Sequence, residues 1–183
     1  MSKSLSKMLP QKEIGVEASP SSERNAAEAE ALFVEAEKLQ EQGALKKAHE
    51  ALLQAAALGH TGAQVTLGNN FSSGVGVDGS DEKAAYWYKR AYREGDESGA
   101  LNLAIDKLRD HNTRAAVFWF NRARLMGSGE ATLELAKIFL TKKQGKVKAI
   151  RFLEMTQKMK PREISDDAKE EAARLLSSIT TVQ

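Results

Sequence analysis

The sequence predicts an all-α fold, an α/α solenoid of about four helical hairpins that ends in a capping helix. The first observation is a repeat, because Gly59, Gly95 and Gly127 follow similar blocks at intervals of 36 and 32 residues. A period in this range is typical of stacked helical hairpins. The second observation is composition, since the 183 residues contain only three prolines and are rich in alanine, leucine, lysine and glutamate. With 42% hydrophobic and 28% charged residues, the chain can form one domain with a continuous core.

Small residues keep the register of the glycines and form the third observation. Four residues before and four residues after each glycine stands a small residue: Ala55, Ala63, Ala91, Gly99, Ala123 and Ala131. Such residues at fixed offsets let two helices approach closely. Large residues recur as well, because Trp87 and Trp119 occupy equivalent positions. We expect both indole rings in the core, where replacement by alanine costs about 3 to 5 kcal/mol.

The chain begins with a polar segment and then alternates helices with short breaks. Residues 1–22 carry two of the three prolines and several serines, and we expect a flexible tail. Ser21 or Ser22 offers an N-cap to the first helix. Gly43 ends that helix, and Gly59 is placed to end the second in a left-handed conformation. We expect helices at residues 25–42, 44–58, 62–72, 81–94, 98–109, 113–126, 129–141, 146–159 and 166–178.

The last of these helices is expected to close the stack. Pro161 stops the eighth helix, and Ser165 caps the ninth. The ninth helix has acidic residues in its first turn, which suit the positive end of the helix dipole. Its apolar positions form one stripe, which indicates that it seals the open end. The organisation is therefore a tail over residues 1–22, a solenoid over 23–160, and a capping helix with a tail over 161–183.

One segment resembles a known repeat family. Residues 67–95 resemble the Sel1-like repeat, a relative of the tetratricopeptide repeat, and match it at these positions: Leu67, Gly68, Gly74, Gly76, Val77, Asp81, Lys83, Ala84, Trp87, Tyr88 and Ala91. The next unit keeps the aromatic and small residues but lacks the glycine-rich loop, and the outer units are less typical. The resemblance covers about residues 26–160. It implies an α/α solenoid that acts as a protein-binding scaffold or adaptor and has no catalytic residues.

In hairpin solenoids of this kind the first helix of each unit lines the concave face. The positions expected to point into it form two rows, an apolar one and one that changes from acidic through neutral to basic: Phe33, Val65, Leu101 and Leu133; Glu37, Asn69, Ile105 and Lys137. These rows suit an extended peptide or a helix bound in the groove. The alternative is that the apolar row is core packing. Aspartate at both Val65 and Leu101 would abolish partner capture in the first case and unfold the chain in the second.

Charge is uneven along the chain, although its net value is only +2. Residues 13–50 contain nine glutamates against four basic residues, whereas residues 137–162 contain nine basic residues against one acid. Such polarity can steer an oppositely charged protein. Nucleic acid is a less favoured partner, because aromatic residues are scarce among the lysines and no known motif is present. The alternative is a solvated surface that aids solubility.

The sequence offers no pattern for a catalytic, cofactor or metal site. It contains no cysteine, which excludes disulfides and thiolate sites. The glycines at 74, 76 and 79 lack the lysine and hydroxyl pair of a phosphate loop. His49, His60 and His111 stand alone, without the spacing of metal ligands. No apolar run reaches the roughly 18 to 20 residues that span a bilayer, and the N-terminus lacks the apolar stretch of a secretory signal, so we expect a cytoplasmic protein without membrane insertion.

These observations predict a protein that binds another protein or peptide, without a small-molecule substrate. The favoured role is an adaptor or assembly scaffold. The alternative is an immunity or inhibitor protein that blocks a cognate toxin or enzyme, by analogy with bacterial repeat domains of this size. An enzyme is the least favoured class, because no nucleophile is paired with a base and an oxyanion donor. The identity of the partner and the oligomeric state remain open at this stage.

Overall fold

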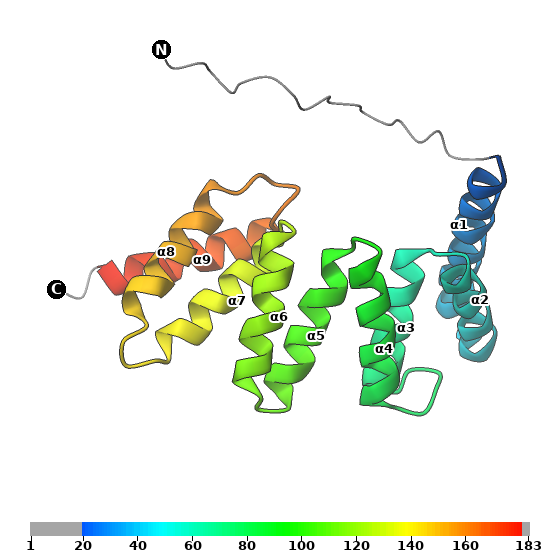
Figure 1. Cartoon of the computed structure of the whole chain (residues 1–183), viewed down its shortest axis with the longest axis horizontal. Coiled ribbons are helices and arrows are strands. Elements are labelled where there is room, and N and C mark those ends of the chain that lie inside the picture. Colours follow the sequence, from blue (N-terminus) through cyan, green and yellow to red (C-terminus); the bar gives the residue numbers. More distant parts are fainter. Residues whose placement is uncertain (1–19, 181–183) are drawn as a thin grey trace, which may run out of the picture.

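The computed structural model describes residues 20–180, which form nine helices and no strand (Figure 1). The helices are α1 (Pro20–Glu41), α2 (Leu45–Ala57), α3 (Thr61–Ser73), α4 (Asp81–Arg93), α5 (Glu97–Arg109), α6 (Thr113–Leu125), α7 (Gly129–Leu140), α8 (Lys146–Lys158) and α9 (Asp166–Thr180). Each helix packs on the next, and α9 lies against both α8 and α7. Four hairpins and a closing helix confirm the predicted all-α solenoid.

The expected boundaries of α2 to α9 agree with the structure to within two residues. The first helix differs, because α1 already includes Pro20. Ser21 and Ser22 therefore lie inside the helix and are not the N-cap that we expected. A proline is tolerated there, since the first turn of a helix needs no backbone N–H donor. Residues 1–19 of the expected tail, together with residues 181–183, lie outside the described part of the chain.

The backbone conformation at the repeated glycines explains why glycine stands there. Gly59, Gly95 and Gly127 have φ angles of 95°, 95° and 111°, in the left-handed region that favours glycine. Each follows the second helix of a hairpin and turns the chain into the next hairpin. One residue after each glycine stands an N-cap: His60, Asp96 or Ser128 accepts a hydrogen bond from a backbone N–H in the first turn of the following helix.

The small residues stand where two helices approach each other closely. A Cβ atom added to Gly68 of α3 would lie 2.3 Å from the Tyr88 ring of α4, so only glycine leaves room for this ring. A Cβ on Gly99 of α5 would lie 2.3 Å from the Tyr88 carbonyl oxygen. The main chain of α4 is thus wedged between α3 and α5. The close approach predicted at Gly99 is confirmed, and Gly68 shows a second one.

The core runs along the stack as a series of connected clusters. Large side chains that are at most 1% exposed recur along the helices: Leu52, Leu67, Leu103, Phe120, Leu135 and Leu153. Trp87 packs against two clusters, one spanning α1 to α3 and one spanning α3 to α5. Trp119 joins the second of these to the next cluster along. Both indoles are only half-buried, so they lie at the seams between hairpins and not in the fully buried core that we expected.

The first helices lie next to one another on one face of the stack. This is shown by direct contacts between α3 and α5 and between α7 and α9, which skip the intervening helix. We call this the inner face, and the side formed by α2, α4, α6 and α8 the outer face. The glycine loop between α3 and α4 packs back on the fold, since the Ser80 N–H donates to the Phe71 carbonyl at 2.8 Å. No helix in residues 20–180 is long and apolar enough to cross a membrane.

Candidate functional site

The eight residues predicted for the concave groove all lie on first helices, but the structure separates them by burial. Glu37, Asn69 and Ile105 are exposed, and Ile105 is 45% exposed despite its apolar side chain. Phe33, Val65, Leu101 and Lys137 are half-buried: they belong to α1, α3, α5 and α7. The charged and polar row is therefore accessible, whereas most of the apolar row is partly covered.

The prediction for Leu133 is corrected. This side chain is 2% exposed and packs with Leu153 of α8 and Ala172 of α9. It is a core residue because α9 takes the place that a further first helix would occupy. The neighbouring Lys137 bridges the same junction, since its Nζ lies 2.8 Å from carboxylate oxygens of both Glu134 and Glu171.

Phe33 and Leu101 also contribute to packing. The Phe33 ring stacks on His60 with centroids 4.4 Å apart. His60 itself accepts from the Ala63 N–H through Nδ1, and its Nε2 lies 3.0 Å from a Glu30 carboxylate oxygen. Leu101 packs against the core cluster of α5 to α7. The alternative that the apolar row is core packing thus holds for Leu133 and in part for Phe33 and Leu101.

Asn69 and Ile105 meet at a pocket on the inner face between α3 and α5. The pocket has a volume of about 230 Å³ and is lined by Asn69, Ser72, Ser73, Tyr88, Asn102, Ile105, Asp106 and Arg109. Tyr88 comes from α4, is 2% exposed and forms the floor. We call this the inner pocket. Two adjacent first helices supply its walls, because the solenoid places residues about one repeat apart side by side.

Asn69 is the centre of a hydrogen-bond network in the inner pocket. Its Oδ1 accepts from the Tyr88 hydroxyl at 2.8 Å and from Asn102 Nδ2 at 3.2 Å. The two donors use both lone pairs of this oxygen and so fix the amide orientation. Among residues 20–180, the Asn69 Nδ2 group and the Asn102 Oδ1 atom have no hydrogen-bond partner. An unpaired donor on the exposed Asn69 and an unpaired acceptor on the half-buried Asn102 therefore stand at the same place in the groove.

A second network holds Arg109 at the edge of the inner pocket. Arg109 Nη2 donates to Asp106 Oδ1 at 2.8 Å and to Ser72 Oγ at 2.9 Å, and Ser72 Oγ donates to Asp106 at 3.1 Å. Burial raises the pKa of the Asp106 carboxyl, and the Arg109 guanidinium opposes this effect. Burial, with the nearby Asp106 carboxylate, also raises the pKa of the Tyr88 phenol to about 12. Tyr88 is therefore a neutral hydrogen-bond donor at physiological pH.

Sequence reasoning missed most residues of this pocket. It named one outward position per turn and did not include Ser72, Asn102, Asp106 or Arg109, and it assigned Tyr88 only to the repeat signature. The sequence did contain a signal for this pocket, because the polar residues that meet across α3 and α5 are separated by about one repeat. Asn69 and Asn102 are 33 positions apart, and Ser72 and Asp106 are 34 positions apart.

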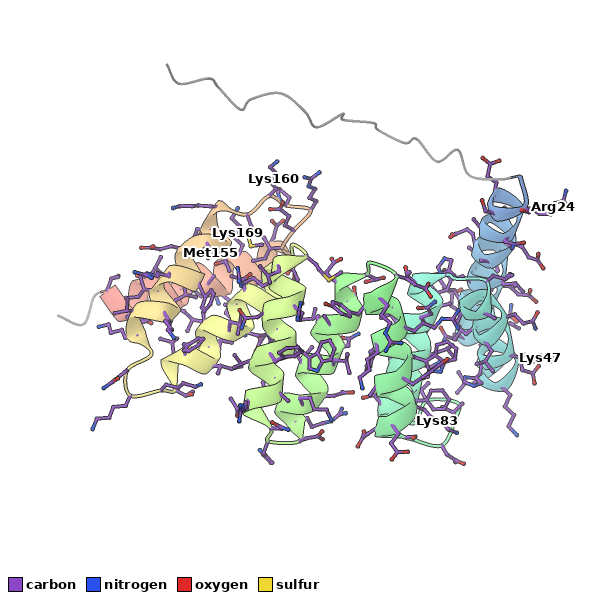
Figure 2. All side chains as sticks on the ribbon, in the orientation of Figure 1. Arg24, Lys47, Lys83, Met155, Lys160 and Lys169 are labelled. Carbon is purple, nitrogen blue, oxygen red and sulfur yellow. The ribbon has the colours of Figure 1, made fainter. Side chains whose placement is uncertain are left out.

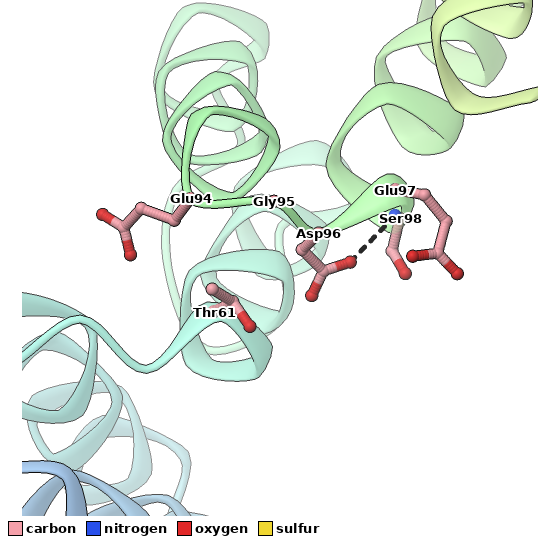
Figure 3. Close-up of a pocket in the computed structure, with 6 residues that line it drawn as sticks. All are labelled: Thr61, Glu94, Gly95, Asp96, Glu97 and Ser98. Carbon is pink, nitrogen blue, oxygen red and sulfur yellow. Dashed lines mark hydrogen bonds between the residues drawn. The ribbon is translucent and has the colours of Figure 1, made fainter. Parts of the chain in front are cut away.

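A larger hollow of about 410 Å³ lies at the turn between α4 and α5, as Figure 3 shows. Two of its acidic side chains stabilise the local structure. Asp96 Oδ1 accepts from the Ser98 N–H at 2.9 Å and caps α5 (Figure 3). Glu94 accepts from Gln64 Nε2 at 2.8 Å and pairs with Arg90. No cluster of metal-ligating side chains occurs in the part of the chain that the structure describes.

Solved structures with the same arrangement of helices are bacterial repeat proteins. The Sel1 repeat protein from Oxalobacter formigenes matches with a TM-score of 0.60 and 22% identity, over 82% of this chain and 61% of its own length. A protective antigen with an SLR fold from uropathogenic Escherichia coli strains matches with a TM-score of 0.61 and 20% identity, over 86% of this chain and 33% of its own. This chain thus spans less than two thirds of either protein. No protein-family model and no curated protein sequence matches it.

The likeness to these two proteins shows that the chain has the Sel1 repeat fold, as the resemblance of residues 67–95 implied. An immunity protein from Pseudomonas aeruginosa matches at a TM-score of 0.35 and 13% identity. That value is too low to carry an argument about fold or function. The likeness concerns the fold: this chain is a stack of helical hairpins of the Sel1 repeat kind.

Proposed function

We propose that this chain, with its Sel1 repeat fold, is a non-catalytic adaptor or assembly scaffold that holds an extended segment of a partner protein on its inner face. The proposal includes the cytoplasmic location expected from the sequence. The binding site centres on the inner pocket and extends along α3 and α5 through Val65 and Ile105. It keeps the predicted groove but replaces the buried Leu133 by the polar residues around Asn69.

The observation that carries the proposal is the paired amides of Asn69 and Asn102. A peptide main chain presents one N–H and one C=O at each residue, which an extended segment leaves available for a partner. Asn69 Nδ2 can donate to such a C=O, while Asn102 Oδ1 can accept from such an N–H. Recognition of this kind depends on the backbone and tolerates different sequences.

Neighbouring side chains add contact surface and orientation. Ile105 is 45% exposed beside the amides and provides an apolar contact for a partner side chain. Arg109 lies at one end of the pocket with its guanidinium held by Asp106 and Ser72. Because these contacts already fix the arginine, little conformational entropy is lost when it meets a partner.

The proposal is tested by selecting peptides from a random display library on the immobilised full chain. A selected peptide is synthesised with a fluorophore, and its affinity is measured by fluorescence anisotropy for the wild type and for the double variant Asn69→Ala with Asn102→Ala. Two lost hydrogen bonds of about 0.5 to 1.5 kcal/mol each predict an affinity roughly tenfold weaker or more. Asn69 is exposed and Asn102 is half-buried, and neither belongs to the buried core, so the helical circular dichroism of the variant should match the wild type.

A double variant on the outer face, Lys148→Gln with Arg151→Gln, is the matched control and should bind the same peptide with unchanged affinity. Selected peptides that bind the asparagine variant as tightly as the wild type would contradict the assignment of the site. A selection that enriches no peptide would contradict peptide binding itself. This pair is a sharper test than aspartate at Val65 and Leu101, because Leu101 packs against the core.

A further inference from the structure

The basic residues of the chain gather on one part of the outer face. Helices α6 and α8, together with the connecting residues 141–145, carry nine basic residues against the single acid Glu154: Arg114, Arg122, Arg124, Lys142, Lys143, Lys146, Lys148, Arg151 and Lys158. On the inner face, α5, α7 and α9 carry eight acids against five basic residues. The asymmetry that the sequence shows along the chain is thus also one between the two faces.

The cations of the two faces also differ in their partners. On the inner face, Arg109, Lys137 and Arg174 each form an ion pair with a carboxylate. Within residues 20–180, none of the nine cations on α6, on α8 and in the connection between α7 and α8 forms one. Their mutual repulsion is unrelieved in the isolated chain, and a negatively charged partner would relieve it.

Two of these unpaired cations, Lys148 and Arg151, line an apolar groove between α6 and α8. The groove has a volume of about 390 Å³ and is lined by Asn121, Phe139, Lys148, Arg151, Phe152 and Met155. We call it the outer groove. Phe139 of α7 and Phe152 of α8 stack with centroids 5.8 Å apart and provide aromatic surface within it. Met155, labelled on α8 in Figure 2, is 40% exposed beside them.

Exposed apolar side chains extend this surface along both helices. On α6, Phe118 is 52% exposed and Leu125 is 70% exposed, and they stand about one turn before and one turn after Asn121. On α8, Val147 is 64% exposed and precedes Arg151 by one turn. Large apolar side chains in this number, interleaved with unpaired cations, mark an interaction surface more often than a simple solvated one.

We propose that the outer groove binds an acidic segment of a partner protein, with one apolar or aromatic side chain against Phe139 and Phe152 and flanking carboxylates paired with Lys148 and Arg151. The complementarity is twofold. The apolar floor excludes water around the inserted side chain, while the rim supplies cations that have no partner within the chain. Ion pairs formed at the rim of such a groove add specificity and speed association.

A protein segment fits this groove better than nucleic acid. Binding of single strands depends on aromatic faces that are open to stack on bases. In this groove, cations already lie over the aromatic rings. Lys142 Nζ and Lys148 Nζ are 5.0 Å and 5.1 Å from the Phe139 centroid. Arg124 lies over Phe152 at 5.8 Å and Arg122 over Phe118 at 5.2 Å. A carboxylate can pair with these cations where they stand, and a single apolar side chain can contact the ring edges, whereas a base that stacks on a ring face would have to displace the cations.

The test uses a short fluorescent peptide in which a central phenylalanine is flanked on both sides by glutamates. Its anisotropy is measured with the full chain and compared with three other probes: the same peptide with serine for phenylalanine, the same peptide with lysine for glutamate, and a single-stranded oligothymidylate of equal charge. We expect the phenylalanine–glutamate peptide to bind most tightly and the lysine peptide not to bind. Its affinity should fall as salt is raised.

The decisive variant is Lys148→Gln with Arg151→Gln, which removes the two rim cations from exposed positions. We expect it to weaken the phenylalanine–glutamate peptide about tenfold or more, with unchanged circular dichroism. The inner-face variant Asn69→Ala with Asn102→Ala should leave this affinity unchanged, so that failure at one face is distinguishable from failure at the other.

Four results would overturn the proposal. Absence of binding by the phenylalanine–glutamate peptide would remove it altogether. Equal affinity of the serine peptide, or unchanged affinity in the Lys148 and Arg151 variant, would show that the groove itself is not used. Tighter binding of oligothymidylate would assign the face to nucleic acid.

Discussion

Tyr88 links the packing of the stack to its inner face. Its ring fills the space that Gly68 leaves open, and its hydroxyl donates to Asn69 at the floor of the inner pocket. The same side chain therefore fixes the distance between α3 and α4 and the orientation of the exposed amide. A hydroxyl at this depth is satisfied only because Asn69 reaches it.

The raised pKa of Tyr88 predicts a loss of stability at alkaline pH. The phenol has a pKa of about 12 in the folded chain and an ordinary value near 10 when unfolded. Stability from this group is complete below pH 10 and is lost between about pH 10 and 12, because the unfolded chain releases the proton first. Urea titrations over this range should show a fall of up to about 1.4 kcal/mol for each pH unit.

The variant Tyr88→Phe isolates that effect. It should be less stable than the wild type by about 1 kcal/mol at neutral pH, since the hydrogen bond to Asn69 is lost. Its stability should fall less steeply above pH 10, because phenylalanine has no proton to release. Parallel pH profiles for the two proteins would show that Tyr88 does not titrate as its surroundings indicate.

At the scale of elements, α9 decides where the inner face ends. It lies against α7 and α8 and buries Ala172 together with Leu133 and Leu153. The Ser165 N–H also donates to Glu130 Oε1 at 2.9 Å, which ties the start of α9 to α7. Without this helix, the groove would continue over Leu133.

Removal of α9 is expected to loosen the last hairpin selectively. A chain that stops after Ser165 should exchange the backbone amides of α7 and α8 much faster than the full chain, because two buried leucines become exposed. Amides of α3 and α4 should exchange at nearly unchanged rates, since each hairpin contacts only its neighbours. Hydrogen exchange measured by mass spectrometry gives this comparison, and a uniform rise along the chain would contradict it.

At the scale of the whole molecule, half-buried tryptophans connect the clusters of adjacent hairpins. Trp87→Ala and Trp119→Ala should each cost about 3 kcal/mol, the lower end of the range expected for a buried tryptophan, because part of each ring is exposed. Thermal unfolding followed by circular dichroism measures the effect. Tyr86→Ala is the control, since its side chain is 58% exposed on the same helix and should cost much less. Equal effects of all three changes would refute the seam position.

The whole molecule also separates two surfaces of different chemistry. The inner face is a polar groove in which Arg109, Lys137 and Arg174 are paired with carboxylates, whereas the outer face at α6 and α8 combines unpaired cations with exposed apolar residues. A stack of hairpins produces this naturally, because adjacent first helices and adjacent second helices form grooves on opposite sides. The two proposals together predict that the chain holds two different partner segments at once.

The sequence by itself determined the local structure and its repetition. Positive φ angles require glycine at Gly59, Gly95 and Gly127, and side-chain caps require polar residues beside them, so hairpin boundaries were readable within two residues for α2 to α9. Tight packing likewise demands small residues at Gly68 and Gly99, which no larger residue could replace. These constraints act over a few residues or recur at a fixed interval, and such patterns are visible in one chain.

Only the tertiary structure decided which of those positions are accessible. The curvature of the stack brings Asn69 to Asn102 and Ser72 to Asp106, and the position of α9 buries Leu133, although its place in the register equals that of the half-buried Val65. Phe139 lies on the first helix α7 and yet lines the outer groove, which its position in the repeat does not indicate. Exposure depends on the helix two elements away, and no local pattern in the sequence records where that helix lies.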